Sequence, residues 1–475
     1  MAKESKIPYQ DHFQLYRKLT DNGRNISLLL ESRSLNMRYG KESIIVPNPA
    51  VRISGKNERF TITALTKAGE KILARLTDDD FQYAVEVTRK GNTINGKVPR
   101  ESNKNIRENE RTRLRNVSFI FRSLIKKFHS DSPYNGLYGL AAYDFARNYY
   151  SIGKKHKNDE GDDFIFFIPS ELYVFNDITK EAKHIVFFEG DAKASKGFVF
   201  RKGKGRIRQD ISDEDYRSQV SKAIKDIRKG RAMQCVLSRQ VEVPLKKDPM
   251  VSYNELREIN PSPYSFFFNL GNNEIFYGAS PELHIKVEKG EIEIRPIAGT
   301  VKRSSNPFDD AQARIFLLTD DKERREHSML VDLARNEIYA LSYPESVVVS
   351  DLFTVEAYPN LYHLVSGVKG KLRNGIDAFD ALLITLPAGT LSGAPKQEAM
   401  RMIEEYETSR RGFYGGIIGY FSFNGDCNTG IAIRSVHVKG SKSYIRSGGG
   451  VVALSTPDGE LKESRLKMEK MLKVV

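Results

Sequence analysis

The pattern of hydrophobic and polar positions predicts short strands in the first part of the chain. Residues 27–32, 60–65 and 136–145 either alternate between apolar and polar or form short apolar runs. Such lengths and patterns are typical of strands. Residues 91–116 are polar and rich in charge, and we expect a mobile excursion there. Residues 191–210 are rich in Lys, Arg and Gly, so they are the best candidate for a boundary.

The second part of the chain predicts a mixture of helices and strands. A helix begins after Ser212, which forms a capping box with Asp215, and apolar residues recur on one face until Gly230 ends it. Further helices are predicted at 320–340 and 459–473, and strands at 234–238 and 292–294. Because helices and strands do not alternate strictly, the pattern favours an α+β fold with antiparallel sheets. The expected organisation is an N-terminal region (1–190), a linker (191–210) and a catalytic region (211–475).

The composition indicates a cytoplasmic globular protein. The 475 residues are 40% hydrophobic, and the two cysteines, Cys235 and Cys427, form no CxxC motif. No stretch approaches the about 20 apolar residues of a membrane span, and the polar N-terminus has no signal-peptide core. The net charge of +14 is spread along the chain without a nucleic-acid-binding motif. We therefore expect neither a membrane nor a nucleic acid as a partner.

Two pairs of carboxylates are candidate metal ligands. Glu323 and Glu326 lie three residues apart on one predicted helix, and Glu460 and Glu463 repeat that spacing on another. Taken alone, each pair is more often a salt bridge or a solvated face. Together they could hold one Mg²⁺ ion, which needs only one or two carboxylates beside substrate oxygens. His327 points about 100° away around the helix from Glu326, so we do not expect it to be a ligand.

Glycine-bearing turns and one arginine are candidates for binding an anion. Turns of this kind occur at 298–300, 389–395, 414–416 and 448–450. Closely spaced backbone N–H groups can hold a carboxylate, although most such turns are only turns, and none matches a P-loop or a Rossmann fingerprint. Arg434 stands among apolar neighbours, so it faces either a pocket or a partner anion.

The order of several motifs resembles the chorismate-binding enzymes, a family that includes anthranilate, aminodeoxychorismate, isochorismate and salicylate synthases. The motifs are PIAGT (296–300), EHSMLVDLARNE (326–337), YHLVSGVKG (362–370), GTLSGAPK (389–396), RRGFYGGIIGYF (410–421), IAIRS (431–435), SGGGVV (447–452) and ELKES (460–464). The resemblance is strong over 210–475 and looser at 28–32 and 136–145. It implies an α+β fold of two large antiparallel β-sheets packed as a sandwich, with flanking helices and the site in a cleft.

The resemblance also implies how substrate and metal are held. Mg²⁺ would connect the ring carboxylate of chorismate to Glu326 and Glu463, with Glu323 and Glu460 in support. The remaining binding residues implied by the resemblance are Gly448 and Gly450 for the ring carboxylate, Tyr414 and Arg434 for the enolpyruvyl carboxylate, and Gly299 and Thr300 for the substrate.

Four residues are implied in catalysis: Glu282, His363, Gln234 and Thr390. Glu282 matches the general acid that protonates the departing C4 hydroxyl. Because that role needs a neutral carboxyl group, we expect its pKa to be raised. His363 matches the histidine associated with pyruvate loss. On an apolar strand such a histidine would more often be a core residue, but the motif favours the catalytic role.

Two positions favour the anthranilate-forming branch of the family. Relatives that add water carry a lysine where this chain has Gln234, because water needs a base, whereas ammonia does not. Aminodeoxychorismate synthases carry a nucleophilic lysine where this chain has Ala298, which cannot react. We therefore expect a carbon–oxygen lyase that aminates chorismate at C2 with ammonia and then expels pyruvate. An aminodeoxychorismate or aminodeoxyisochorismate synthase is the alternative. A non-catalytic tryptophan-sensing or nucleic-acid-binding protein is less favoured, because the acids are intact.

The resemblance implies one regulator and one protein partner. Five residues resemble the tryptophan feedback site of anthranilate synthases: Glu31, Ser32, Pro261, Pro263 and Tyr264. Ser265 and Gly430 depart from that pattern, so the strength of inhibition by L-tryptophan is open. The sequence contains no glutaminase motif, and neither cysteine has the context of a nucleophile. A separate glutamine amidotransferase subunit is therefore expected to supply the ammonia.

Overall fold

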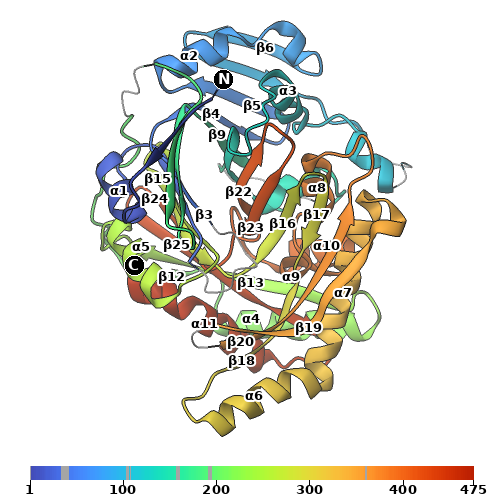
Figure 1. Ribbon diagram of the computed structural model, residues 1–475. Coiled ribbons are helices and arrows are strands. Elements are labelled where there is room, and N and C mark those ends of the chain that lie inside the picture. The colour runs from blue at the N-terminus through green and yellow to red at the C-terminus, as the bar shows by residue number, and fades with distance from the viewer. Residues whose placement is uncertain are drawn as a thin grey trace.

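Two large antiparallel sheets organise the chain in a computed structural model (Figure 1), which describes residues 2–33, 42–102, 106, 108–153, 155–156, 161–190, 195–358 and 361–475. In the 12-stranded sheet the order is β1 (Lys3–Ile7), β11 (Glu181–Val186), β10 (Glu171–Asn176), β3 (Glu42–Val46), β2 (Ser27–Glu31), β14 (Tyr264–Gly271), β15 (Glu274–Ser280), β24 (Ser435–Lys439), β25 (Lys442–Val452), β13 (Gln234–Pro244) and β12 (Arg208–Gln209), with β21 (Gly393–Ala394) paired to β13.

In the 13-stranded sheet the order is β18 (Ile297–Lys302), β20 (Leu361–Lys371), β17 (Glu291–Ile294), β16 (Leu283–Glu288), β23 (Cys427–Ile431), β22 (Ile417–Ser422), β8 (Gly136–Ala141), β9 (Phe164–Pro169), β4 (Pro49–Lys56), β5 (Arg59–Ala64), β7 (Thr93–Lys97) and β6 (Val85–Lys90), with β19 (Val348–Ala357) paired to β20. The predicted sandwich of antiparallel sheets is confirmed. Both sheets take strands from either side of residues 191–210, so the two regions that the sequence divides share one framework. Residues 191–194 of the expected linker lie outside the described residues.

Helices cover the outer faces of the sheets (Figure 1). They are α1 (His12–Leu19), α2 (Lys67–Ala74), α3 (Phe119–Lys127), α4 (Asp213–Arg228), α5 (Pro249–Ile259), α6 (Pro307–Thr319), α7 (Asp321–Leu341), α8 (Ala378–Thr385), α9 (Gly389–Ser392), α10 (Lys396–Tyr406) and α11 (Pro457–Val474), with short 3₁₀ turns at Asp78–Phe81, Glu108–Arg113, Tyr143–Asn148 and Pro344–Ser346. No helix in the described residues is long and apolar enough to cross a membrane.

The core lies in three layers, because each sheet buries both faces. Between the sheets, Leu28 and Phe266 of the first sheet join Leu140 and Ile165 of the second in one apolar cluster. A larger cluster packs α2, α3, α7 and α8 on the 13-stranded sheet and continues through α4 and α10 onto β13 of the 12-stranded sheet. A third cluster packs α1, α5 and α11 on the 12-stranded sheet. The helices that carry the predicted acids are therefore attached to sheets rather than to loops.

Local sequence signals account for the helix boundaries. Ser212 caps α4 by accepting a hydrogen bond from the backbone N–H of Asp215, and Gly230 adopts a φ of 85° after the helix, as the capping box and the glycine predict. The predicted helices at 320–340 and 459–473 correspond to α7 and α11. Short-range periodicity was sufficient for these elements because their apolar stripes face a sheet.

The expectation of a mobile excursion at 91–116 was wrong in part, because part of this segment belongs to a sheet. Thr93–Lys97 form β7, which pairs with both β5 and β6, and the side chain of Ile94 is buried. The alternation in this strand is short and its apolar residues are few, so polarity hid the period of two. Residues 103–105 and 107 of this segment lie outside the described residues.

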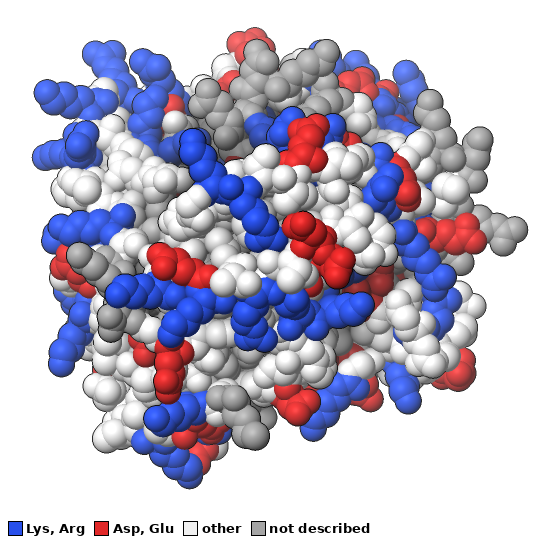
Figure 2. Space-filling model, turned by 90° about the horizontal axis from the view of Figure 1, so that it is seen from above, with Lys and Arg blue, Asp and Glu red and all other residues white. Residues whose placement is uncertain are grey.

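Charged side chains lie among residues of other kinds on the face of the molecule seen in Figure 2. Lys and Arg form a row across the middle of that view, and Asp and Glu lie on both sides of it. The excess of positive charge is therefore mixed with acidic residues on this face.

Candidate active site

A cleft of about 700 Å³ contains every residue that the sequence predicts for catalysis, substrate binding and metal binding. Its walls come from β13, β18, β20, β25, α7, α9 and α11, and from the loops around residues 281, 414 and 434. The predicted residues that line it are Gln234, Glu282, Gly299, Thr300, Glu323, Glu326, His363, Thr390, Tyr414, Arg434, Gly448, Gly450, Glu460 and Glu463. The two predicted helices with paired acids therefore face one cavity, although more than a hundred residues separate them.

Glu282 is a buried carboxyl group that favours its protonated form. It follows β15, and the residue is only 6% exposed. Burial raises its pKa to about 8, against the opposing effect of a hydrogen bond from Thr390 Oγ1 to Oε1 at 2.8 Å. The raised pKa predicted from the sequence is present, and a neutral carboxyl at pH 7 can donate a proton.

Carboxylates of α7 and α11 face one another across the cleft. Burial and the negative charges of Glu323 and Glu463 raise the pKa of Glu326 to about 6. Burial, and then the charge of Glu463, raise the pKa of Glu460 to about 7. A Cβ atom on Gly449 would lie 2.2 Å from Glu460 Oε2, so this glycine leaves the space that the carboxylate occupies. Repulsion between such neighbouring acids is relieved by a cation.

The acids fit a divalent cation that also takes ligands from a substrate. Glu460 Oε2 is buried and has no hydrogen-bond partner among the described residues. Glu326 Oε1 lies 3.2 Å from Gln234 Nε2, and Glu463 Oε1 lies 2.5 Å from Lys467 Nζ. In the described part of the chain, no three His, Cys, Asp or Glu side chains form a metal cage by themselves. This arrangement suits Mg²⁺, which is commonly bound by one or two carboxylates and substrate oxygens.

Three consecutive glycines of β25 bring backbone N–H groups up to the cleft. A Cβ on Gly448 would lie 2.1 Å from the carbonyl oxygen of Leu237, and a Cβ on Gly450 would lie 2.2 Å from Gln234 Nε2. Only glycine therefore allows β25 to approach β13 and the amide of Gln234 so closely. The glycine backbone lines the cleft, where N–H groups could bind a carboxylate beside the acids of α11.

Arg434 and Tyr414 bring unused donors to another wall of the cleft. Within the described residues, neither the guanidinium of Arg434 nor the hydroxyl of Tyr414 makes a hydrogen bond or an ion pair with another side chain. Arg434 has a φ of 50°, an uncommon conformation for a residue other than glycine that clusters at functional sites. Burial lowers the pKa of Arg434. Such a half-buried cation is complementary to an anionic ligand group.

His363 is a neutral base in the wall of the cleft. It lies on β20 opposite Thr300 of β18, and the hydroxyl of Thr300 is 2.8 Å from His363 Nδ1. The ring of Tyr358 meets the imidazole edge to face at a centroid distance of 5.1 Å. Burial, and then the positive charge of Arg434, lower the pKa of His363 to about 4. The imidazole is therefore uncharged at pH 7 and can accept a proton.

Gln234 and Ala298 line this cleft, so neither of these two positions carries a lysine. The amide oxygen of Gln234 is buried and has no hydrogen-bond partner among the described residues. It can accept a hydrogen bond from a small donor that enters the cleft. Ala298 presents only a methyl group, which offers no nucleophile.

The cleft also contains cations that sequence reasoning did not single out. Lys467 donates a hydrogen bond to the carbonyl oxygen of Gly448 at 3.0 Å and pairs with Glu463 four residues before it on α11. Lys470 donates to Asn260 Oδ1 at 2.7 Å, and Arg446 lines the cleft from β25. The spacing of four residues between Glu463 and Lys467 was a visible signal for the first of these.

Among the described residues, the arginines of α7 do not form a salt bridge with Glu326, and His327 faces away from it. Arg335 pairs with Asp332, and Arg324 donates to the carbonyl oxygen of Leu318, so neither arginine neutralises Glu326. His327 is fully buried with its Nε2 atom 2.6 Å from the hydroxyl of Ser366. The prediction that His327 points away from the acids is confirmed.

A second buried carboxylate site surrounds Glu31 of β2. Glu31 accepts hydrogen bonds from His12 Nε2 at 2.8 Å and Arg257 Nη2 at 2.6 Å, and also from the hydroxyl of Tyr253. Burial alone would raise the pKa of Glu31, but the hydrogen bond from His12 and the charge of Arg257 lower it to about 2. This carboxylate is therefore ionised and fully engaged by the protein.

The other residues predicted for a feedback site lie beside Glu31. Glu31 pairs with Ser265 across β2 and β14, and the backbone N–H of Arg33 donates to the carbonyl oxygen of Ser262 at 3.0 Å. The backbone N–H of Ser32 lies 3.3 Å from Ser43 Oγ. Tyr264 donates to Asn428 Oδ1 at 3.0 Å, Pro263 is buried, and Pro261 lines the catalytic cleft. The two segments are thus neighbours, and one reaches the cleft.

Comparisons with known proteins agree with this geometry. A family profile described as chorismate binding enzyme matches residues 69–473. The chain is 34% identical to anthranilate synthase component 1 of Buchnera aphidicola, over 95% of this chain and 92% of that protein. It is 33% identical to anthranilate synthase component 1 of Vibrio cholerae, over 99% and 95% of the two chains.

A solved structure has the same architecture. The crystal structure of anthranilate synthase component I from Streptococcus pneumoniae superposes with a TM-score of 0.69 at 28% sequence identity. The match covers 92% of this chain and 93% of that chain. The resemblance therefore extends over both sheets and the cleft between their helices.

Proposed function

The chain belongs to the chorismate-binding enzymes, and we propose that it is the chorismate-binding component of an anthranilate synthase. The observation that carries the proposal is the identity of Gln234 and Ala298 in the wall of the cleft. In the family, lysines at these places serve water addition at C2 or covalent attack by the enzyme. Their absence leaves direct attack of ammonia at C2, and the reaction is that of a carbon–oxygen lyase.

Amination begins with the loss of the C4 hydroxyl group. The neutral carboxyl of Glu282 donates its proton to the C4 oxygen, the C4–O bond breaks, and water leaves. The nitrogen of ammonia bonds to C2, while the two ring double bonds shift toward C4. The nitrogen then loses one proton, which balances the proton given by Glu282. The unpartnered amide oxygen of Gln234 can hold the ammonia by accepting one of its hydrogens.

Pyruvate is lost in the second step. Neutral His363 takes the proton from C2, the electrons form a C2–C3 double bond, and the C3–O bond breaks. The departing enolpyruvate gains a proton and becomes pyruvate, and the ring becomes aromatic as anthranilate. The hydroxyl of Thr300 lies 2.8 Å from Nδ1 of His363, and this contact orients the imidazole as the base.

Two sets of residues in the cleft bind the two carboxylates of the substrate. The N–H groups around Gly448 and Gly450 bind the ring carboxylate, and Tyr414 and Arg434 bind the enolpyruvyl carboxylate. We propose that Mg²⁺ is held by Glu326 and Glu463, supported by Glu323 and Glu460. When bound, the ion neutralises the ring carboxylate and polarises it.

We also propose a protein partner and a regulator. The name component 1 in the relatives implies a second component, which we infer to be a glutamine amidotransferase that releases ammonia beside this chain. L-tryptophan is the proposed inhibitor, bound near residues 31–32 and 261–264. Because Glu31 is already engaged by Arg257 and His12, the amino group of tryptophan would have to use other acceptors in this region.

The product of the reaction with free ammonia tests the proposal. The purified chain is incubated with chorismate, Mg²⁺ and ammonium, and we expect fluorescent anthranilate with one pyruvate per anthranilate. An aminated product that keeps its enolpyruvyl group would instead assign the chain to an aminodeoxychorismate or aminodeoxyisochorismate synthase. His363→Met should convert the wild-type product into that aminated intermediate, because the base for C2 is lost.

A further inference from the structure

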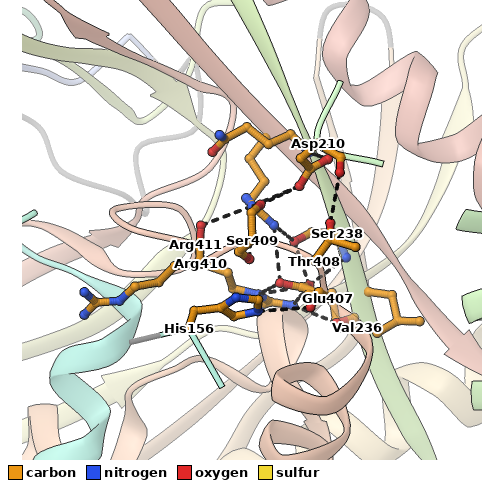
Figure 3. A network of polar contacts seen from close by, with 12 residues as sticks. His156, Asp210, Val236, Ser238, Glu407, Thr408, Ser409, Arg410 and Arg411 are labelled. Carbon is orange, nitrogen blue, oxygen red and sulfur yellow. Dashed lines mark hydrogen bonds and ion pairs between the residues drawn. The ribbon is translucent and has the colours of Figure 1, made fainter. Parts of the chain in front are cut away.

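A fully buried arginine outside the predicted site connects three walls of the cleft. The side chain of Arg411 is 2% exposed, and it lies in the polar network of Figure 3 between the end of α10 and β13. Its guanidinium donates to the carbonyl oxygen of Leu391 at 2.6 Å and to that of Val236 at 2.7 Å. Leu391 follows Thr390, and Val236 lies two residues after Gln234.

The carboxylate of Glu407 orients this guanidinium. Arg411 Nε lies 3.0 Å from Glu407 Oε2, and Arg411 Nη2 lies 2.6 Å from Glu407 Oε1 (Figure 3). Glu407 Oε1 also accepts from the backbone N–H and the hydroxyl of Ser238 on β13, at 2.8 and 2.7 Å. A bidentate, fully buried pair of this kind leaves the guanidinium one orientation.

The third wall is the ring of Tyr414. The guanidinium carbon of Arg411 lies 5.8 Å from the centroid of the Tyr414 ring and 4.6 Å from that of Tyr143. The backbone N–H of Tyr414 donates to the carbonyl oxygen of Arg411 at 3.3 Å. Arg411 therefore contacts the elements that carry Thr390, Gln234 and Tyr414.

The turn that carries Thr390 needs support from outside. The helix α9 has only four residues, and no side chain caps its N-terminus. The last carbonyl groups of a helix have no partner within the helix, and Arg411 supplies one for Leu391. On the other side, Gly393 and Ala394 pair with Cys235 and Gln234 of β13. The guanidinium and this short pairing together clamp the turn against β13.

We propose that Arg411 is a positioning residue for the reaction: its guanidinium fixes the turn of Thr390 against β13 and thereby holds the Thr390 hydroxyl on Glu282. The inference rests on the proposed function, because it assigns Arg411 to the protonation step of that reaction. Thr390 Oγ1 is 2.8 Å from Glu282 Oε1, so a small displacement of the turn misaligns the general acid. Misplacement by about 1 Å can cost on the order of 100-fold in rate.

The substitution Arg411→Lys tests this role. The ammonium keeps the positive charge beside Glu407 but lacks the planar fork that reaches both carbonyl oxygens. With ammonium, Mg²⁺ and varied chorismate, we expect kcat to fall about 10–100-fold and the KM for chorismate to change by less than about threefold, because Arg434 and the glycines that bind substrate are intact. An unchanged kcat, or a rise in KM alone, would overturn the inference.

Arg410→Lys is the matched control. Arg410 is the neighbouring arginine and is also held by carboxylates, at Asp144 and Asp163. We expect its kcat per folded molecule to stay within about twofold of the wild type, because neither aspartate lines the cleft. Anthranilate formation by the wild-type chain tests the proposed function separately, so failure of one claim is distinguishable from failure of the other.

A double-mutant cycle shows whether Arg411 acts through Thr390. Thr390→Val removes the hydroxyl that contacts Glu282 and should lower kcat by itself. If the arginine works by holding this hydroxyl, adding Arg411→Lys to Thr390→Val should lower kcat by less than about threefold further. Losses that multiply in full would overturn the inference. Should Arg411→Lys fail to fold in thermal melts, Glu407→Gln enters the same cycle, because it releases the guanidinium from its fixed orientation.

Discussion

Buried carboxylates in two regions of this chain have opposite electrostatic environments. Around Glu31, the charge of one arginine and hydrogen bonds from one histidine and one tyrosine stabilise the carboxylate, and the pKa is lowered to about 2. In the cleft, the pKa of Glu282 is raised to about 8 and that of Glu460 to about 7, because burial acts without a matching cation. Both regions adjoin the 12-stranded sheet, so the difference lies in the partners that the fold supplies.

The two regions contain acids of two kinds: an acid that stabilises the fold, and acids that take part in binding or catalysis. A buried carboxylate that is paired contributes to the folded state only as long as its partner remains. A buried carboxylate that lacks a cationic partner weakens the folded state unless it is protonated or binds a ligand. Glu31 belongs to the first kind. Glu282, Glu460 and the half-buried Glu326 belong to the second. Substitutions should therefore affect stability in one region and activity in the other.

The largest effect is expected at the general acid. Glu282→Gln removes the proton donor but keeps the shape of the side chain, so kcat should fall by about 10²–10⁴-fold, while the thermal midpoint stays the same or rises. Steady-state rates and thermal melts measure the two quantities. Glu288→Gln, an exposed acid on β16 that pairs with Lys286, is the control and should leave both unchanged. A variant of Glu282 that is unstable but active would show that Glu282 is a structural acid and not the general acid.

Glu31→Gln should show the reverse behaviour. The change leaves the buried guanidinium of Arg257 without its counter-charge, and breaking such a pair costs about 3–5 kcal/mol of unfolding free energy. Urea unfolding measures the loss, and kcat per folded molecule should be unchanged. Glu258→Gln, on the same helix as Arg257 and 59% exposed, should cost less than about 1 kcal/mol. Equal losses in the two variants would show that Glu31 is not a structural acid.

The metal-binding acids should couple activity to magnesium. Glu463→Gln should lower kcat about 100-fold, because electrostatic stabilisation by the ion is worth several kcal/mol. It should also abolish any rise in the thermal midpoint that Mg²⁺ causes in the wild type, which reports binding without turnover. Glu469→Gln, an exposed acid on the same helix paired with Lys473, should retain both properties. Retention of both by Glu463→Gln would contradict the ligand assignment.

The smallest effects are shifts in pH dependence, and their signs differ between the regions. Because Glu282 must be protonated, kcat should fall above about pH 8, and Thr390→Val should move this limb to higher pH by removing a hydrogen bond that lowers the pKa.

Glu31 has a pKa below its ordinary value of 4.5, so its contribution to stability is present above pH 4.5 and is lost as pH falls toward 2. The stability difference between wild type and Glu31→Gln should shrink over that range.

Much of the site could be anticipated because its residues occur in long motifs. The spacing of Glu460 and Glu463, the glycines of 448–450 and the isolated Arg434 each left a local signal in the sequence. The same local logic predicted α4, α7 and α11. It failed for β7, whose few apolar residues did not reveal a strand, and it passed over Lys467 and Arg411, which resemble ordinary charged positions.

The sequence by itself determined which residue types were present and which short elements they form, because capping, periodicity and glycine requirements act over a few neighbouring positions. Only the tertiary structure decided which charges meet. Glu31 lies 226 residues from Arg257, and Thr390 lies 108 residues from Glu282, so no local pattern distinguishes the paired acid from the unpaired one. Burial and partner distance set the protonation of each carboxyl group, and both are properties of the folded sheets rather than of the segment that carries the residue.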